Sequence, residues 1–190
     1  MNIEYIPGIT KFGYPQGRMG RGGLRPTALV IHVMEGTING TTSWFRRPIS
    51  SNPGSKVSYN YGVGKNGRIV CWVRDENAAW ANGGIQNPTW RGLLKTASGY
   101  VNPNLYTISI AREGFNGELC TPRQYQSLLY VVRLMVDKYR LPINRNTIIG
   151  HYEIDSRKPL CPGRINLDHF VSELRTKKPT GGGDKPLDVL

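Results

Sequence analysis

The chain has 190 residues and a formal net charge of +12 at pH 7. This length suits one domain with a real hydrophobic core. No apolar stretch approaches the roughly 20 residues that span a bilayer, which argues against membrane insertion. The charge favours an anionic partner, such as nucleic acid or the teichoic acids and phosphates of a bacterial envelope. Because the basic residues are scattered and no reading motif accompanies them, nucleic acid is disfavoured, and a well-solvated surface explains the charge equally well.

The N-terminal residues 1–24 are rich in Gly and Arg, which predicts an irregular arm. No basic segment followed by an apolar core is present there, so no secretory signal is visible, and we expect synthesis in the cytoplasm. The three cysteines cannot all pair with one another, and Cys71 and Cys120 are expected to be reduced thiols.

Strand signals dominate the next part of the chain. Residues 28–33 form an apolar run broken only by His32 and predict a buried strand. Hydroxyl residues before two aromatic residues at 41–45 predict the start of a helix. Residues 57–64 and 68–73 flank Lys65-Asn66-Gly67, and Asn-Gly is a strong hairpin signal. Residues 82–104, full of Gly, Asn and Pro, predict a long loop that could form a groove wall.

The second half alternates further strands with helices. Residues 106–111 predict a strand, and Thr121 precedes a helix whose apolar face continues to Tyr139, with Gln124 completing a capping box. Residues 147–149 predict a short strand, and residues 167–174 an amphipathic helix. This alternation predicts an α/β fold in one domain over residues 1–176. Residues 177–190 predict a flexible C-terminal linker.

One short segment, residues 150–163, places His151 and Cys161 ten residues apart on either side of a turn. An imidazole nitrogen and a thiolate are ligands that zinc prefers. His32, at the end of a buried strand, is the candidate for a third ligand, although a lone histidine there also fits a satisfied core residue. Together the three residues form a set that suits a catalytic zinc with one position open for water.

The order of these motifs resembles the zinc-dependent N-acetylmuramoyl-L-alanine amidases, which include many phage endolysins and the peptidoglycan recognition proteins. The likeness covers residues 25 to 175. It rests on the strand that carries His32, the segments 58–70, 79–83 and 107–110, and the His–Cys segment 150–163. The resemblance implies a central mixed β-sheet flanked by helices, with a zinc groove at one end of the sheet.

The resemblance also implies a reaction: hydrolysis of the amide between N-acetylmuramic acid and L-alanine in peptidoglycan, with Zn²⁺ held by the three ligands above. Tyr59 matches a tyrosine near the zinc, whose hydroxyl could bond the zinc-bound water or the oxyanion. Trp80, Asn82 and Glu35 are expected to contact the substrate in the groove. Without the resemblance, Tyr59 and Trp80 would also fit packed core aromatics.

Two positions depart from the family pattern. Many relatives carry a glutamate directly after the Ser-Ile-x-Ile strand as a general base, but this chain has Ala111 there, which can do no acid–base work. Tyr59 and a lysine could suffice without it, and Glu113 or Glu35 could substitute. The family's lysine often stands two residues before the third ligand, where this chain has proline; Lys158, one residue earlier, is the candidate, and a solvated basic loop is the alternative.

These departures leave other functions open. Ala111 favours a non-catalytic or substrate-trapping peptidoglycan-binding protein, whereas Cys161 favours an enzyme. A hydrolase that uses Cys161 as its nucleophile is a further alternative. The basic domain, the absent signal and the Gly-rich linker suit a phage or prophage endolysin that acts at the bacterial cell wall, with a bacterial autolysin as the close alternative. The linker could lead to a cell-wall-binding domain.

Overall fold

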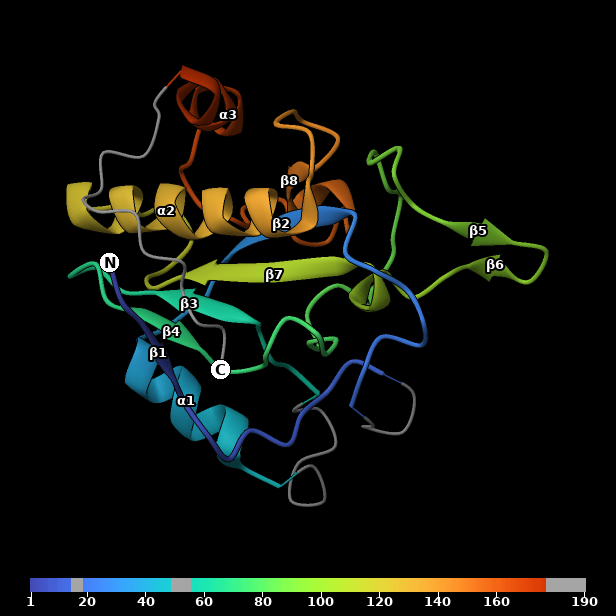
Figure 1. The fold of residues 1–190 in the computed structure, drawn as a ribbon, viewed down its shortest axis with the longest axis horizontal. Coiled ribbons are helices and arrows are strands. Elements are labelled where there is room, and N and C mark those ends of the chain that lie inside the picture. The colour runs from blue at the N-terminus through green and yellow to red at the C-terminus, as the bar shows by residue number, and fades with distance from the viewer. Residues whose placement is uncertain (15–18, 49–55, 177–190) are drawn as a thin grey trace.

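Six short strands form one mixed sheet with helices on both faces (Figure 1). The computed structural model describes residues 1–14, 19–48 and 56–176. The strand order is β1 (Ile3–Tyr5), β4 (Ile69–Cys71), β3 (Tyr61–Val63), β7 (Thr107–Arg112), β2 (Ala28–Val33) and β8 (Ile148–Gly150). β3 and β4 pair antiparallel, and the other neighbouring pairs are parallel. The predicted α/β class with a central mixed sheet is confirmed.

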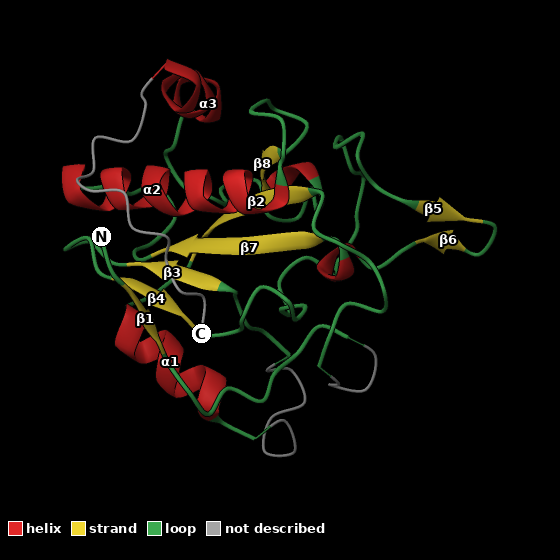
Figure 2. Ribbon diagram, viewed as in Figure 1, coloured by secondary structure: helices red, strands yellow, loops and turns green. Residues whose placement is uncertain are grey.

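The helices divide between the two faces of the sheet (Figure 2). α2 (Pro122–Tyr139) and α3 (Leu167–Thr176) cover one face, and α1 (Ile38–Arg46) lies on the other. Because successive strand residues point to opposite faces, Ile31 and Ile110 pack in the core cluster under α2 and α3, whereas Ala111 packs in the cluster that contains Phe45 of α1. His32 directly follows Ile31, so its side chain lies on the face away from α2.

The N-terminal half differs from the prediction at two places. The arm is not irregular throughout, since β1 pairs in parallel with β4 at the edge of the sheet. α1 begins at Ile38, earlier than predicted, because Thr37 is its N-cap and accepts a hydrogen bond from the Gly40 N–H. The hydroxyl residues at 41–43 therefore lie inside the helix. The predicted hairpin is present as the shorter strands β3 and β4.

The later elements agree with the prediction apart from details. Thr121 caps α2, but Gln124 does not complete a capping box, because its amide donates to the carbonyl oxygens of Val63 and Glu113 instead. The predicted loop 82–104 contains a small hairpin, β5 (Lys95–Thr96) and β6 (Gly99–Tyr100), and part of the 3-10 turn η4 (Pro103–Leu105). The predicted linker 177–190 lies outside the described residues.

Two further observations concern the whole described chain. Cys71, Cys120 and Cys161 are all free thiols, as expected for the first two. Within residues 1–14, 19–48 and 56–176, no helix is long and apolar enough to cross a membrane.

Candidate metal centre

Two histidines lie at the carboxyl ends of neighbouring parallel strands. His32 is the second-to-last residue of β2, and His151 directly follows β8, at the start of the 3-10 turn η5 (His151–Glu153). β2 and β8 are hydrogen-bonded neighbours with Ile31 opposite Gly150, so their carboxyl ends coincide. The two imidazole ring centroids are 4.6 Å apart.

Cys161 completes the cluster from the loop after η5. Its Sγ atom lies 3.8 Å from Nδ1 of His32 and accepts a hydrogen bond from the Val33 N–H at 3.4 Å. The ligand atoms of His32, His151 and Cys161 all lie within 4.8 Å of one another, and the three residues are buried. The three residues that the sequence analysis grouped as metal ligands are therefore brought together.

The geometry and the donor set fit zinc. Ligand atoms of one tetrahedral zinc lie about 3.3–3.8 Å apart, since Zn–N and Zn–S bonds are about 2.0–2.3 Å long. The observed trio needs only a small contraction to reach that spacing. Two imidazoles and one thiolate also leave one coordination position open, which is typical of catalytic rather than structural zinc sites.

Burial sets the protonation of the ligands. It lowers the pKa of His151 to about 4 and the pKa of His32 well below its ordinary value, so both rings are neutral near pH 7, which is the form that binds a metal. Burial also raises the pKa of the Cys161 thiol to about 11, although the Val33 N–H and the positive charge of Lys158 oppose the rise. A metal must therefore displace the thiol proton when it binds.

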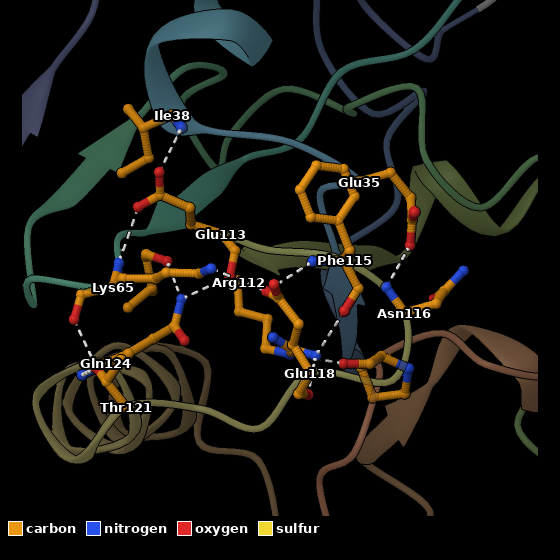
Figure 3. Close-up of polar contacts among 12 residues, drawn as sticks. Glu35, Ile38, Lys65, Arg112, Glu113, Phe115, Asn116, Glu118, Thr121 and Gln124 are labelled. Carbon is orange, nitrogen blue, oxygen red and sulfur yellow. Dashed lines mark hydrogen bonds and ion pairs between the residues drawn. The ribbon is translucent and has the colours of Figure 1, made fainter.

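A buried arginine anchors the loop that carries Cys161. Arg112, at the end of β7, donates from Nε to the carbonyl oxygen of Pro162 at 2.8 Å. Its Nη2 atom donates to the carbonyl oxygens of Glu118 at 2.7 Å and Phe115 at 3.3 Å (Figure 3). These bonds connect the residue next to the ligand to the 115–118 loop, so Arg112 fixes the position of Cys161 relative to the sheet.

A cavity of about 630 Å³ opens beside the cluster, with His151 and Cys161 in its wall. Glu35, Tyr59, Trp80 and Lys158, which the sequence analysis proposed as site residues, also line it. An adjoining hollow of about 350 Å³ shares Glu35, Val57 and Tyr59 with the cavity and extends to Trp44 of α1. The two hollows meet at these shared residues and are together called the groove.

The tyrosine and the lysine both lie close to the ligands. The ring centroid of Tyr59 is 5.1 Å from that of His32. Burial raises the pKa of Tyr59, and negative charge at Cys161 and Glu35 adds to the rise, so its hydroxyl stays protonated and able to donate a hydrogen bond. Lys158 lines the same cavity, and its positive charge adds to the lowering of the pKa of His151 and opposes the rise of the pKa of Cys161.

Comparisons with known proteins agree with this geometry. The family model described as N-acetylmuramoyl-L-alanine amidase matches residues 22–164. The chain belongs to this family. The resemblance seen in the sequence is thereby confirmed.

Two curated amidases and two solved structures illustrate the likeness. The chain is 28% identical over 121 residues to the 1,6-anhydro-N-acetylmuramyl-L-alanine amidase AmpD of Haemophilus influenzae, which covers 63% of this chain and 60% of that protein. It is 32% identical over 89 residues to N-acetylmuramoyl-L-alanine amidase A of Achromobacter lyticus, which covers 46% of this chain and 37% of that protein. The chain thus matches less than two thirds of the length of each curated relative.

The solved structures show the same fold. The amidase LysC from Clostridium intestinale superimposes with a TM-score of 0.65 at 19% identity, covering 93% of this chain and 99% of that chain. The structure of PlyL gives a TM-score of 0.63 at 18% identity, covering 92% of this chain and 97% of that chain.

The position of the absent glutamate is adjacent to one of the clustered histidines. Ala111 on β7 lies directly opposite His32 on β2, is fully buried and points to the same face of the sheet. Glu113 does not replace it, because its carboxylate accepts hydrogen bonds from the N–H groups of Ile38 and Lys65 and does not line the cavity (Figure 3).

Glu35, in contrast to Glu113, lies in the groove. It lines both hollows, and its Oε1 atom accepts a hydrogen bond from the Asn116 N–H at 2.8 Å (Figure 3). Its φ of 54° is in the left-handed region, an uncommon conformation for a residue other than glycine. Of the two glutamates that the sequence analysis considered, Glu35 is therefore the one that faces the groove.

Trp80 and Asn82, the two substrate contacts predicted in the segment 79–83, lie in different environments. Trp80 lines the amidase groove, with the Lys56 ammonium 5.5 Å from the centre of its ring. Asn82 is fully buried and does not line the cavity, so the structure gives no groove surface to this predicted substrate contact. Sequence reasoning missed Lys56 and Arg112, because no motif marks either residue.

Proposed function

We propose that this chain is a zinc-dependent N-acetylmuramoyl-L-alanine amidase that cleaves the amide between N-acetylmuramic acid and L-alanine in bacterial peptidoglycan. The observation that carries the proposal is the convergence of His32, His151 and Cys161 beside a groove whose wall contains His151 and Cys161, in a chain of the amidase family. When bound by these residues, zinc would lower the pKa of a water molecule and polarise the amide carbonyl.

The groove residues supply the other functions of the reaction. Tyr59 donates a hydrogen bond from its protonated hydroxyl to the developing oxyanion, and Lys158 adds positive charge on the same side. Glu35, the groove-facing carboxylate, accepts the proton of the attacking water and returns it to the leaving amine of L-alanine. Trp80 provides an apolar wall for the sugar or the stem peptide.

The geometry disfavours Cys161 as a nucleophile. Burial raises the pKa of its thiol to about 11, whereas a nucleophilic cysteine needs a lowered pKa. The same two imidazoles that would surround the thiol are neutral because of burial, so neither supplies the positive charge that stabilises a thiolate. The Cys161 sulfur fits a metal ligand better.

The cellular role follows the substrate. We propose that the protein acts at the bacterial cell wall as a phage or prophage endolysin; its fold is shared with structures described as endolysins, including that of the bacteriophage Ph2119 (TM-score 0.54, 18% identity). The net charge of +12 supports additional attraction to anionic cell-wall polymers.

Mass spectrometry of digested peptidoglycan tests the activity. The zinc-loaded protein should create new free L-alanine amines while the glycan chains stay intact. Removal of the metal with a chelator should abolish the release, and added zinc should restore it. Lys158→Ala should lower the rate by at least about tenfold if its charge stabilises the transition state; an undiminished rate would remove Lys158 from the mechanism.

The alternative function is a substrate-trapping or non-catalytic peptidoglycan-binding protein, which Ala111 favours. It predicts that the zinc-loaded protein sediments with purified cell walls but releases no L-alanine amine at any enzyme concentration. Pelleting and mass spectrometry on the same sample therefore separate the two functions.

A further inference from the structure

The Asn82 side chain lies in a buried polar cluster on the sheet face that carries His32. Its Nδ2 atom donates to Oγ1 of Thr107 at 2.8 Å and to Oγ of Ser109 at 3.2 Å, both on β7. Its backbone N–H donates to Oδ1 of Asn104 at 2.6 Å. The side chain and the backbone of Asn82 are thus both held by neighbours.

The hydrogen-bond network fixes which way the Asn82 amide points. The hydroxyl of Thr107 donates its single proton to the carbonyl oxygen of Pro103 at 2.7 Å. Its oxygen can then only accept a hydrogen bond from Asn82. Because Thr107 requires a donor, the NH₂ group of Asn82 must face Thr107, and Oδ1 must point away from it.

The ring of His32 offers a partner for the free oxygen. Oδ1 of Asn82 and Nε2 of His32 are both buried, and in the described part of the chain neither atom has a hydrogen-bond partner of standard geometry. The two side chains lie on the same face of the sheet, because Asn82 bonds Ser109 and Ala111, two residues further along β7, pairs with His32. An interaction with Asn82 also raises the pKa of His32 against the larger effect of burial. A proton on Nε2 would satisfy both atoms, whereas a proton on Nδ1 would leave two buried acceptors facing each other.

We propose that Asn82 is a positioning residue that holds neutral His32 as the Nε2–H tautomer, so that the Nδ1 lone pair faces Cys161 and is ready to bind the metal. Nδ1 is the ring atom that lies 3.8 Å from the Cys161 sulfur. The outer partner of a metal-binding histidine fixes its tautomer and ring orientation in the same way. Here the partner is a neutral amide fixed in turn by Thr107 and Pro103.

This inference rests on the proposed metal site but not on enzymatic turnover, so it is tested on the metal-free protein. Long-range ¹H–¹⁵N correlation spectra report which ring nitrogen of a neutral histidine carries the proton. The chain has three histidines. His169 on α3 is exposed and can be removed as His169→Gln, and His151→Gln assigns the remaining two signals. We expect the Nε2–H tautomer for His32; a majority Nδ1–H tautomer in the wild-type protein would overturn the proposal.

Two substitutions separate positioning from simple packing. Asn82→Leu keeps the size but removes the acceptor, and should shift His32 toward a mixture of tautomers and weaken zinc binding about 10- to 100-fold. Asn82→Asp keeps an acceptor beside Nε2 but cannot donate to Thr107, so it should keep the proton on Nε2 of His32 while it lowers the melting temperature. Zinc affinity is measured by competition with a chromophoric chelator.

A matched control removes a different buried asparagine. Oδ1 of Asn77 accepts a hydrogen bond from the Gly20 N–H, in contrast to Asn82, whose side chain interacts with His32. Asn77→Leu should leave the His32 tautomer and the zinc affinity unchanged even if it lowers the melting temperature. If Asn82→Leu and Asn82→Asp lose melting temperature alike while the tautomer and the zinc affinity stay as in the wild type, Asn82 has only a structural role and the proposal fails.

Discussion

This chain has no glutamate at position 111. We therefore expect catalysis to depend on the carboxylate of Glu35. Glu35→Gln removes its charge but keeps its shape and its hydrogen bond from the Asn116 N–H. A general base contributes about 10²–10⁴-fold to a rate, equivalent to about 2.7–5.5 kcal/mol of barrier. We expect the rate at which Glu35→Gln releases L-alanine amines to be lower than the wild-type rate by a factor in that range.

Zinc binding distinguishes this loss from damage to the metal site. Glu35 is not one of the three clustered ligands, so the zinc affinity should change little. Its negative charge contributes to raising the pKa values of Tyr59 and Cys161, and its removal should therefore lower both slightly rather than raise them. Rates are measured on purified cell walls at saturating zinc, with the metal content of each sample determined in parallel.

Glu113 provides the matched control. Its carboxylate accepts the N–H groups of Ile38 and Lys65 outside the cavity. Glu113→Gln should cost about 1–2 kcal/mol of folding stability and leave the turnover of the folded protein near the wild-type value. A Glu35→Gln variant that retains turnover within about threefold, a factor smaller than general-base effects, would refute the role of Glu35 as the base.

Three further predictions concern neighbouring positions. Ala111→Glu should raise turnover, because it places a carboxylate opposite His32, while overpacking of this fully buried position costs about 1–3 kcal/mol in denaturant unfolding; unchanged or lower turnover contradicts it. Arg112→Met should weaken zinc binding measured by chelator competition, since the bond to the Pro162 carbonyl is lost; unaltered affinity would show that the loop needs no anchor. Burial raises the pKa of Asp75, but bonds from Lys138 and two tyrosines outweigh it and hold the pKa below its usual value. Its stabilisation is therefore complete above the unfolded pKa of about 3.9 and is lost as the pH falls through the folded-state pKa, so Asp75→Asn should lose about 1–3 kcal/mol at pH 7 and progressively less as the pH falls below the unfolded pKa; a loss that does not change with pH would contradict this.

The sequence predicts the sheet and the clustering of His32, His151 and Cys161 well, because both depend on local pattern. The apolar run 28–33 can only be buried as a strand, and His32 is the one polar side chain in it. The Asn-Gly turn at 66–67 likewise determines how β3 and β4 pair. Features that depend on long-range contacts could not be predicted in this way: β1 needs β4 as its partner, and Gln124 bonds backbone groups 61 and 11 residues away instead of capping its own helix.

The placement of Asn82 and Glu35 shows the same limit within the site. Both were expected in the groove, since they lie in or beside motifs of the resemblance. Side chains alternate between the two faces of β7, so Thr107 and Ser109 both point toward Asn82. Their hydroxyl groups accept hydrogen bonds from the Asn82 amide, which is therefore buried. Glu35 stays in the groove because the residue lies past the end of β2, where alternation no longer fixes its direction and the Asn116 N–H holds it instead.

The metal ligands and the catalytic groups are supported by different parts of the fold. His32 and His151 are fixed by the parallel pairing of β2 with β8, which cannot slip by one residue without turning every core side chain to the opposite face. Lys158 and Glu35 stand on loops, where insertions and shifts are tolerated. A lysine displaced by one residue, or a carboxylate moved from β7 to the loop after β2, can therefore arise without disturbing the metal centre. We therefore propose that the general base has moved from position 111 to Glu35, so that an alanine at position 111 beside the cluster of His32, His151 and Cys161 is compatible with an active amidase.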